Sequence, residues 1–103
     1  MADKPLQGVF YHTAQDRASY EIDTDVAFIY KLATVLVQQF GFQSKGIPLD
    51  GIDVVYWDFT RDGLTLTVGW DIWSGCFIFA TTPEGDAVVQ AIGQYLDQVL
   101  HEL

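Results

Sequence analysis

The chain is poor in the residues that most chemical sites require. Its 103 residues include one cysteine, two histidines and no asparagine. The single cysteine, Cys76, excludes a disulfide within the chain and is typical of a reducing compartment. It also leaves too few ligands for a structural zinc site. Without asparagine there is no N-glycosylation site and no amide for a cysteine-protease triad. The glycine patterns that cradle phosphates are missing too, so we expect no metal and no cofactor.

Basic residues and long apolar runs are also scarce. Five lysines and arginines stand against 14 acidic residues, which gives a formal net charge of −9. A phosphate backbone would be repelled, so we expect no nucleic-acid partner, and for the same reason no anionic membrane surface. No apolar run reaches the roughly 18 residues of a membrane span. The N-terminus lacks a signal-peptide pattern, and we expect a cytoplasmic protein. The charge serves solubility or attracts a basic partner.

Apolar and aromatic residues, by contrast, are abundant. Half of the residues are hydrophobic and 15% are aromatic, which excludes a disordered chain. The length suits a single domain over residues 1–103 with one core. Two amphipathic helices are predicted. One follows Asp23 or Thr24 as its N-cap and stops at Gly41, and the other begins with Thr82 as its N-cap. Their apolar stripes are Val26, Ile29, Ala33, Leu36, Val37 and Phe40 in the first, and Val88, Ala91, Ile92, Tyr95, Leu96 and Val99 in the second.

Between the helices the sequence predicts a three-stranded meander. Asp62-Gly63 is a strong signal for a two-residue hairpin turn, and Ser74-Gly75 is a weaker one. Taken as two-residue turns, they place Val55 opposite Trp70 and Trp70 opposite Phe79. Alternation along the strands then sorts the side chains onto two faces. The apolar face, which the helices are expected to cover, carries Val55, Trp57, Phe59, Leu64, Leu66, Val68, Trp70, Ile72, Phe77 and Phe79, and we expect Trp57, Trp70 and Phe79 to be buried.

The remaining segments are harder to assign. "GVFYHT" and "SYEID" have strand composition, and they either extend the sheet as a hairpin or fold across its outer face. Residues 43–51 are predicted to form a loop because of their glycines and proline. The predicted fold class is α+β: a two-layer domain in which two helices pack on one face of an antiparallel β-meander, in the order (ββ)αβββα.

The predicted outer face carries the candidate site. Tyr56, Asp58, Asp71, Trp73 and Ile78 share it, and two large apolar side chains among them require a cover. Three possibilities remain for what covers these side chains: the N-terminal residues of the same chain, a second copy in a homodimer, or a different, basic protein. Gly69 lies opposite Tyr56, whose ring is expected to lie over the gap that the glycine leaves.

These observations favour a non-enzymatic protein-interaction or inhibitory module that binds another protein through its outer sheet face. Small acidic bacterial proteins that neutralise a toxic enzyme share this general character, an analogy of composition rather than of residues. The alternative is a small-ligand-binding protein or metal-dependent enzyme that uses His12 and nearby aspartates, which requires a pocket joining His12 to carboxylates.

Overall fold

The computed structural model describes residues 7–103 and contains one six-stranded antiparallel sheet. Residues 1–6, part of the N-terminal stretch in which a signal peptide was sought, lie outside the described part. The elements are, in chain order, β1 (Gly8–His12), β2 (Ala18–Ile22), α1 (Phe28–Phe40), β3 (Gln43–Asp50), β4 (Val54–Arg61), β5 (Leu64–Asp71), β6 (Gly75–Ala80) and α2 (Pro83–Val99), with a final 3₁₀ turn, Leu100–Glu102. Across the sheet the strand order is β1-β2-β6-β5-β4-β3.

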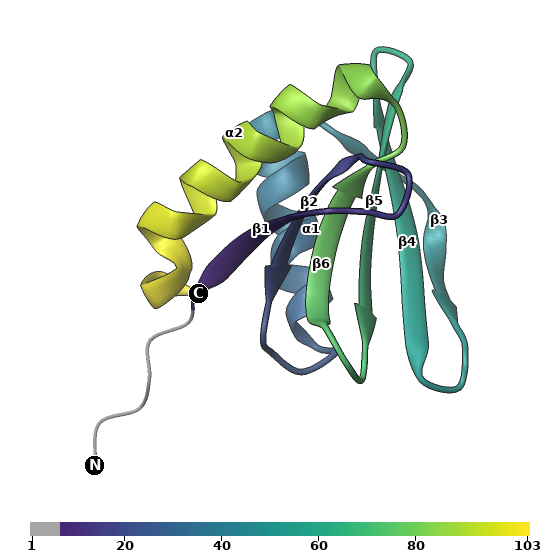
Figure 1. The fold of residues 1–103 in the computed structure, drawn as a ribbon, viewed down its shortest axis with the longest axis vertical. Coiled ribbons are helices and arrows are strands. Elements are labelled where there is room, and N and C mark those ends of the chain that lie inside the picture. Colours follow the sequence, from purple (N-terminus) through teal and green to yellow (C-terminus); the bar gives the residue numbers. More distant parts are fainter. Residues whose placement is uncertain (1–6) are drawn as a thin grey trace.

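Both helices pack on the same face of this sheet (Figure 1). α2 contacts β1, β2, β5 and β6, and α1 contacts β3 and β5, so the two helices meet over β5. The α+β two-layer fold predicted from the sequence is therefore confirmed, with one more strand than expected. No helix within residues 7–103 is long and apolar enough to cross a membrane.

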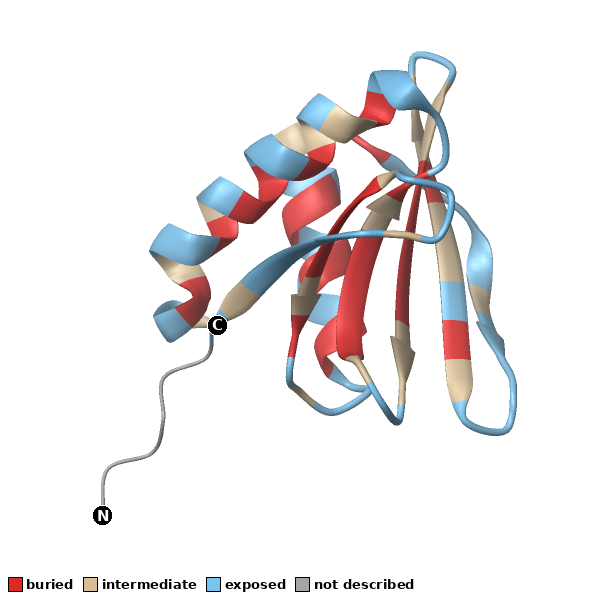
Figure 2. Cartoon of the chain, viewed as in Figure 1, coloured by how far each residue is buried: buried red, intermediate tan, exposed pale blue. Residues whose placement is uncertain are grey.

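The core lies between the sheet and the helices (Figure 2). Its largest fully buried side chains are Tyr20, Phe42, Phe59, Ile22, Ile29, Leu32, Leu36, Leu66, Ile78, Ile92, Leu96 and Val68. α2 approaches the first hairpin closely because Gly93 has no side chain. A Cβ atom there would lie 2.5 Å from the Phe10 ring and 2.7 Å from that of Tyr20. Gly93 thus permits the close packing of α2 on the first hairpin.

The β4–β5 hairpin has the predicted turn and register. Asp62 and Gly63 both have positive φ, 51° and 80°, as a two-residue type I′ turn requires. Val55 pairs with Trp70 and Tyr56 with Gly69, as the turn predicts. The side chains of β4 and β5 therefore lie on the faces to which the sequence assigned them.

The predicted β5–β6 register is wrong. Three residues, Ile72, Trp73 and Ser74, separate the paired positions Asp71 and Gly75, so Trp70 faces Cys76 instead of Phe79. A shift of three positions is odd, and an odd shift moves every side chain of a strand to the opposite face. Ile78 is consequently a core residue that is 1% exposed, and the prediction that placed it on the outer face is wrong.

The same slip changes the expected core. Phe77 and Phe79 lie on the outer face, opposite Gly69 and Thr67, and Phe79 is only half-buried. Trp57 and Trp70 are on the helix side as predicted, but each is packed against the edge of the core and is half-buried rather than buried. The Trp70 indole donates a hydrogen bond to the Thr24 carbonyl at 3.0 Å, which satisfies its only polar atom.

The first hairpin extends the sheet. β2 pairs with β6, and β1 becomes the edge, so within residues 7–103 this segment does not fold across the outer face. At the opposite edge, residues 43–50 form β3 and not the predicted loop. The register of β3 shifts between Lys45 and Leu49, which accommodates Gly46 and Pro48. Proline and bulges are tolerated on an edge strand because one row of its N–H groups has no strand partner.

α1 ends at Gly41 as predicted but begins later than expected. Gly41 adopts the left-handed conformation with φ 73°, whereas the N-cap is Ala27 instead of Asp23 or Thr24. The carbonyl groups of Thr24 and Asp25 accept bonds from Trp70 and Cys76, which keep the segment before the helix against the sheet. α2 begins at Pro83 after Thr82, as expected, although the Thr82 side chain makes no capping hydrogen bond.

Candidate functional site

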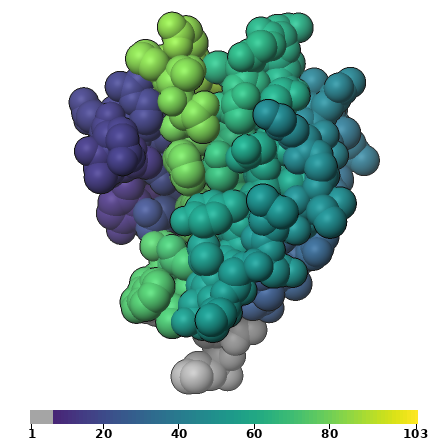
Figure 3. Space-filling view, turned by 90° about the vertical axis from the view of Figure 1, so that its right-hand side faces the viewer, coloured from purple at the N-terminus to yellow at the C-terminus, as the bar shows by residue number. Residues whose placement is uncertain are grey.

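The outer face of the sheet is the candidate site, because both helices of the described chain pack on the opposite face (Figure 1). Figure 3 shows this outer face, with the first hairpin (purple) on one side and the β3–β4 region (teal) on the other. An aromatic row crosses the centre of the face: Tyr56 from β4, with Phe77 and Phe79 from β6. The Tyr56 and Phe77 ring centroids are 6.0 Å apart, and those of Phe77 and Phe79 are 5.9 Å apart.

Gly69 is what allows this row to lie flat on the sheet. A Cβ atom at Gly69 would lie 2.6 Å from the Phe77 ring, so the ring occupies the space above the glycine. Phe77 is therefore only 7% exposed although it lies on the uncovered face. The prediction that the Tyr56 ring lies over this gap is wrong, because Phe77 occupies it and Tyr56 packs beside Phe77. An aromatic residue across from a glycine stabilises a strand in this way.

Two carboxylates flank the row, and each is held by the protein. Asp58 accepts a hydrogen bond from the Thr67 hydroxyl at 2.8 Å, across the predicted β4–β5 pair. Asp71 accepts bonds from the backbone N–H groups of Trp73 at 2.9 Å and Ser74 at 2.5 Å. This arrangement is an Asx turn, in which an aspartate completes the loop that follows it. Asp71 thus positions Trp73 at the tip of the β5–β6 turn.

Trp73 forms one wall of a hollow on the same face. The hollow has a volume of about 280 Å³, and its lining residues are Gln7, Val9, Tyr11, Glu21, Asp23, Trp73 and Ser74. Trp73 is 80% exposed, and Val9 and Tyr11 are each 49% exposed. Two aromatic rings and two carboxylates therefore surround a space that is open to solvent.

Glu21 is one of the two acids that line this hollow. Burial raises the pKa of the Glu21 carboxyl, and the negative charge of Asp71 raises it further. Both effects make the ionised form of Glu21 less favourable. A cation placed between Glu21 and Asp71 would relieve the repulsion, so the electrostatics of the hollow favour a positively charged group.

Four of the five predicted site residues belong to this surface. Tyr56, Asp58 and Asp71 lie on the outer face and Trp73 on the adjoining turn, while Ile78 lies in the core. The sequence reasoning did not identify Glu21 or the outward side chains of β1. Alternation in "GVFYH" and "SYEID" carried that signal, but it could be used only after β2 was known to pair with β6.

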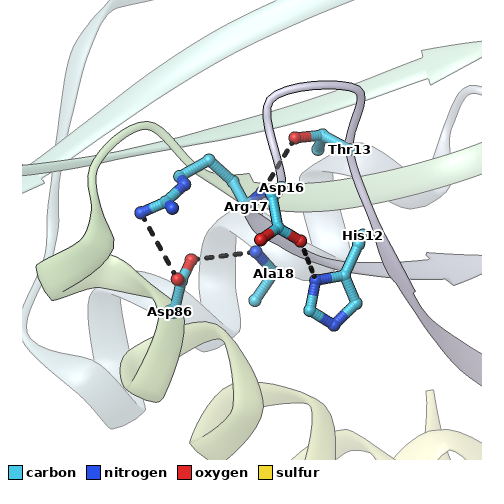
Figure 4. A network of polar contacts seen from close by, with 6 residues as sticks. All are labelled: His12, Thr13, Asp16, Arg17, Ala18 and Asp86. Atoms are coloured by element: carbon cyan, nitrogen blue, oxygen red, sulfur yellow. Dashed lines mark hydrogen bonds and ion pairs between the residues drawn. The ribbon is translucent and has the colours of Figure 1, made fainter.

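The residues of the alternative function form a surface network in the β1–β2 turn (Figure 4). His12 Nδ1 lies 3.0 Å from Asp16 Oδ1, and both side chains are exposed. Asp86, at the start of α2, accepts a bond from the Ala18 N–H at 2.8 Å and lies 3.4 Å from Arg17. The network ties the hairpin to α2.

The surroundings of His12 differ from those that the alternative requires. The hollow next to it, about 220 Å³ in volume, is lined by Phe10, Tyr11, His12, Ala18, Gln90 and Gln94 and by no carboxylate. Among residues 7–103 no group of three or more histidine, cysteine or acidic side chains is arranged to hold a metal ion. The only acid that His12 contacts is thus one on an open turn.

Two buried titratable groups lie on the helix side of the sheet. Burial raises the pKa of the Cys76 thiol to about 11, so the thiol stays protonated and unreactive at neutral pH. It donates a hydrogen bond to the Asp25 carbonyl at 3.3 Å. Burial also raises the pKa of the Tyr20 phenol, and its hydrogen bond to Asp97 raises it further. Both groups stabilise the packing of the segments they join.

No protein-family model, curated protein or solved structure matches this chain. The geometry of the site is therefore the basis for the function proposed below.

Proposed function

We propose that the protein is a non-enzymatic, inhibitory binding module whose outer sheet face recognises a basic protein. The observation that carries the proposal is the hollow beside Trp73, where exposed aromatic rings and carboxylates lie together. Such a surface suits the side chain of arginine or lysine, whose stem packs on the rings while its charge meets the acids.

Two features support a basic partner over a neutral one. The chain carries a net charge of −9, which attracts cations from a distance. The carboxylates of Glu21 and Asp23 line the hollow together with Trp73, so negative charge is concentrated there. Tyr56 and the half-buried Phe79 extend the apolar surface beyond the hollow, so a partner has a contact area around its charged side chain. Exposed aromatic residues are the usual centre of such interfaces.

We place the interaction in the cytoplasm because Cys76 is a buried free thiol, which is typical of a reducing compartment.

The test uses an unstructured arginine-rich peptide and a matched peptide with citrulline at each arginine position, which keeps the shape and removes the charge. Binding is followed by backbone amide chemical shifts. We expect the arginine peptide to shift Trp73, Glu21 and Tyr11, and the citrulline peptide to bind much more weakly. Added salt weakens the binding, because the attraction between opposite charges is screened.

Two variants localise the site. Trp73→Ala should weaken binding about fivefold, the equivalent of one exposed cation–π contact. Ile52→Ala, which removes a fully exposed apolar side chain in the β3–β4 loop, is the matched control and should leave binding unchanged. The proposal is wrong if both peptides bind equally, or if the shifts are as large at the acids of α2, Glu84 and Asp97, as around Trp73.

A further inference from the structure

The two edges of the sheet are built differently. β3, at one edge, contains Lys45, Pro48 and an irregular register, and Gly46 has a φ of 78°. These are the features by which natural proteins prevent the edge of a sheet from pairing with another chain. β3 is therefore protected against strand addition.

β1, at the other edge, has none of these features. Its five residues, Gly8–His12, pair regularly with β2 and contain no proline and no acidic or basic residue except His12. In a chain with 14 acidic residues, this edge strand itself carries no carboxylate. Val9, Phe10 and Tyr11 all remain between 42% and 49% exposed. Unlike β3, this edge is open to a further strand.

The hydrogen-bond pattern of the hairpin shows which backbone groups of Gly8–His12 have no partner within residues 7–103. The Thr13 N–H donates to the Arg17 carbonyl, and in an antiparallel pair the residues that bond across the ladder alternate. Tyr11 and Val9 therefore bond toward β2, while Gly8, Phe10 and His12 direct their backbone groups outward. The Ala18 N–H agrees with this pattern, because it bonds to Asp86 rather than to His12, the residue opposite it.

We propose that β1 pairs antiparallel with β1 of a second copy of the chain, with Phe10 on the two-fold axis. In this register Phe10 faces its own copy and Gly8 faces His12, so the outward N–H and C=O groups of all three residues find partners. Val9 faces Tyr11 of the second copy on the outer side, which covers two exposed apolar side chains. On the helix side, the hollow of about 220 Å³ beside Phe10 has room for a second Phe10 ring. An isologous interface of this kind closes after two copies.

Two double variants test both the edge and the register. Val9→Glu with Tyr11→Glu places like charges at positions that face each other across the axis. We expect it to weaken dimerisation at least about tenfold, since two such facing pairs are lost. Val9→Lys with Tyr11→Glu places opposite charges at the same positions and should restore the dimer. Sedimentation equilibrium measures the state, and for the wild type added salt should strengthen association, because both copies are acidic.

Two further observations decide between this edge and the other. Ile47→Glu with Leu49→Glu makes the same change at two exposed positions of β3 and should leave the dimer intact. Hydrogen exchange should slow at the Gly8, Phe10 and His12 amides as protein concentration rises, while Val9 and Tyr11 stay unchanged. A wild type that remains monomeric at high concentration and high salt overturns the proposal, as does a dimer that the β3 variant dissociates and the β1 variant does not.

Discussion

The two hairpins on either side of β5 close in different ways. Asp62 and Gly63 alone link β4 to β5, and Arg61, just before this turn, donates a hydrogen bond to the Phe40 carbonyl at the end of α1. Three residues separate the paired ends of β5 and β6, and Asp71, just before that turn, binds the backbone of the turn itself. One hairpin is thus anchored to a helix, and the other is organised by its own aspartate.

This difference determines which side chains are available for binding. The longer β5–β6 turn moves Cys76 and Ile78 into the core and turns Phe77 and Phe79 outward. It also leaves Trp73 at an exposed tip beside Glu21. Had the turn contained two residues, the aromatic row on the outer face would not exist. The length of one turn therefore decides the character of the whole face.

The largest expected effect comes from the glycines of the two turns. Gly63 and Gly75 have similar positive φ values, 80° and 74°. A Cβ at Gly63 meets nothing within 4 Å, whereas one at Gly75 lies 2.5 Å from the Ile22 carbonyl oxygen. Gly63→Val should cost about 1–2 kcal/mol for the strained backbone. Gly75→Val should cost roughly 4 kcal/mol, since a backbone clash is added to the strain.

Chemical denaturation of both variants measures this difference in the free energy of unfolding. Gly46→Val is the matched control for Gly63→Val, because Gly46 also has positive φ and a Cβ there meets nothing within 4 Å. Equal losses for Gly63→Val and Gly75→Val would mean that the β5–β6 turn does not lie against the segment after β2.

The second comparison concerns neighbours on β6 that the turn assigns to opposite faces. Ile78 is fully buried under the helices, whereas Phe79 is half-buried on the outer face. Ile78→Ala should destabilise the protein by about 3 kcal/mol, because it leaves a cavity in the core. Phe79→Ala removes more atoms but should cost only about 1–2 kcal/mol, since much of the ring is already in water. The free energies of unfolding would reverse in order if the turn had two residues.

The sequence was sufficient to predict the layers, the presence of both helices and the β4–β5 register, because those features depend on local signals. Two residues of the first predicted stripe, Val26 and Val37, are nevertheless exposed. Asp62-Gly63 requires positive φ at two adjacent positions, and Gly41 ends α1 by the same property. The β5–β6 turn was not predictable from Ser74-Gly75, because its length depends on the bonds from Trp73 and Ser74 to the Asp71 carboxylate. Asp71 stands two residues before Trp73, where an Asx turn places it, and that was the signal that was missed.

The candidate site was predictable only in part for the same reason. Tyr56 and Asp58 follow from the β4–β5 register, and they lie where the sequence assigned them. Ile78 depends on the next turn and was misplaced. Glu21 depends on the pairing of β2 with β6, which joins segments more than 50 residues apart. Long-range pairing of this kind leaves no local pattern in a single sequence.

The smallest expected effect on stability comes from the repulsion between Glu21 and Asp71, the aspartate that organises the β5–β6 turn. The pKa of Glu21 is raised in the folded state, so the folded protein holds the proton more tightly than the unfolded chain. Stability is therefore lost as the pH rises from the ordinary pKa of a glutamate to the raised one. Glu21→Gln removes this loss and should stabilise the protein at neutral pH by less than about 1 kcal/mol, since solvent screens a partly exposed group.

The gain in stability from Glu21→Gln should vanish in acid, where wild-type Glu21 is protonated. In an Asp71→Asn background the gain should shrink, because one of the two causes of the raised pKa is removed. Thermal unfolding across pH measures all four proteins, and a gain that is independent of Asp71 would show that burial alone acts on Glu21.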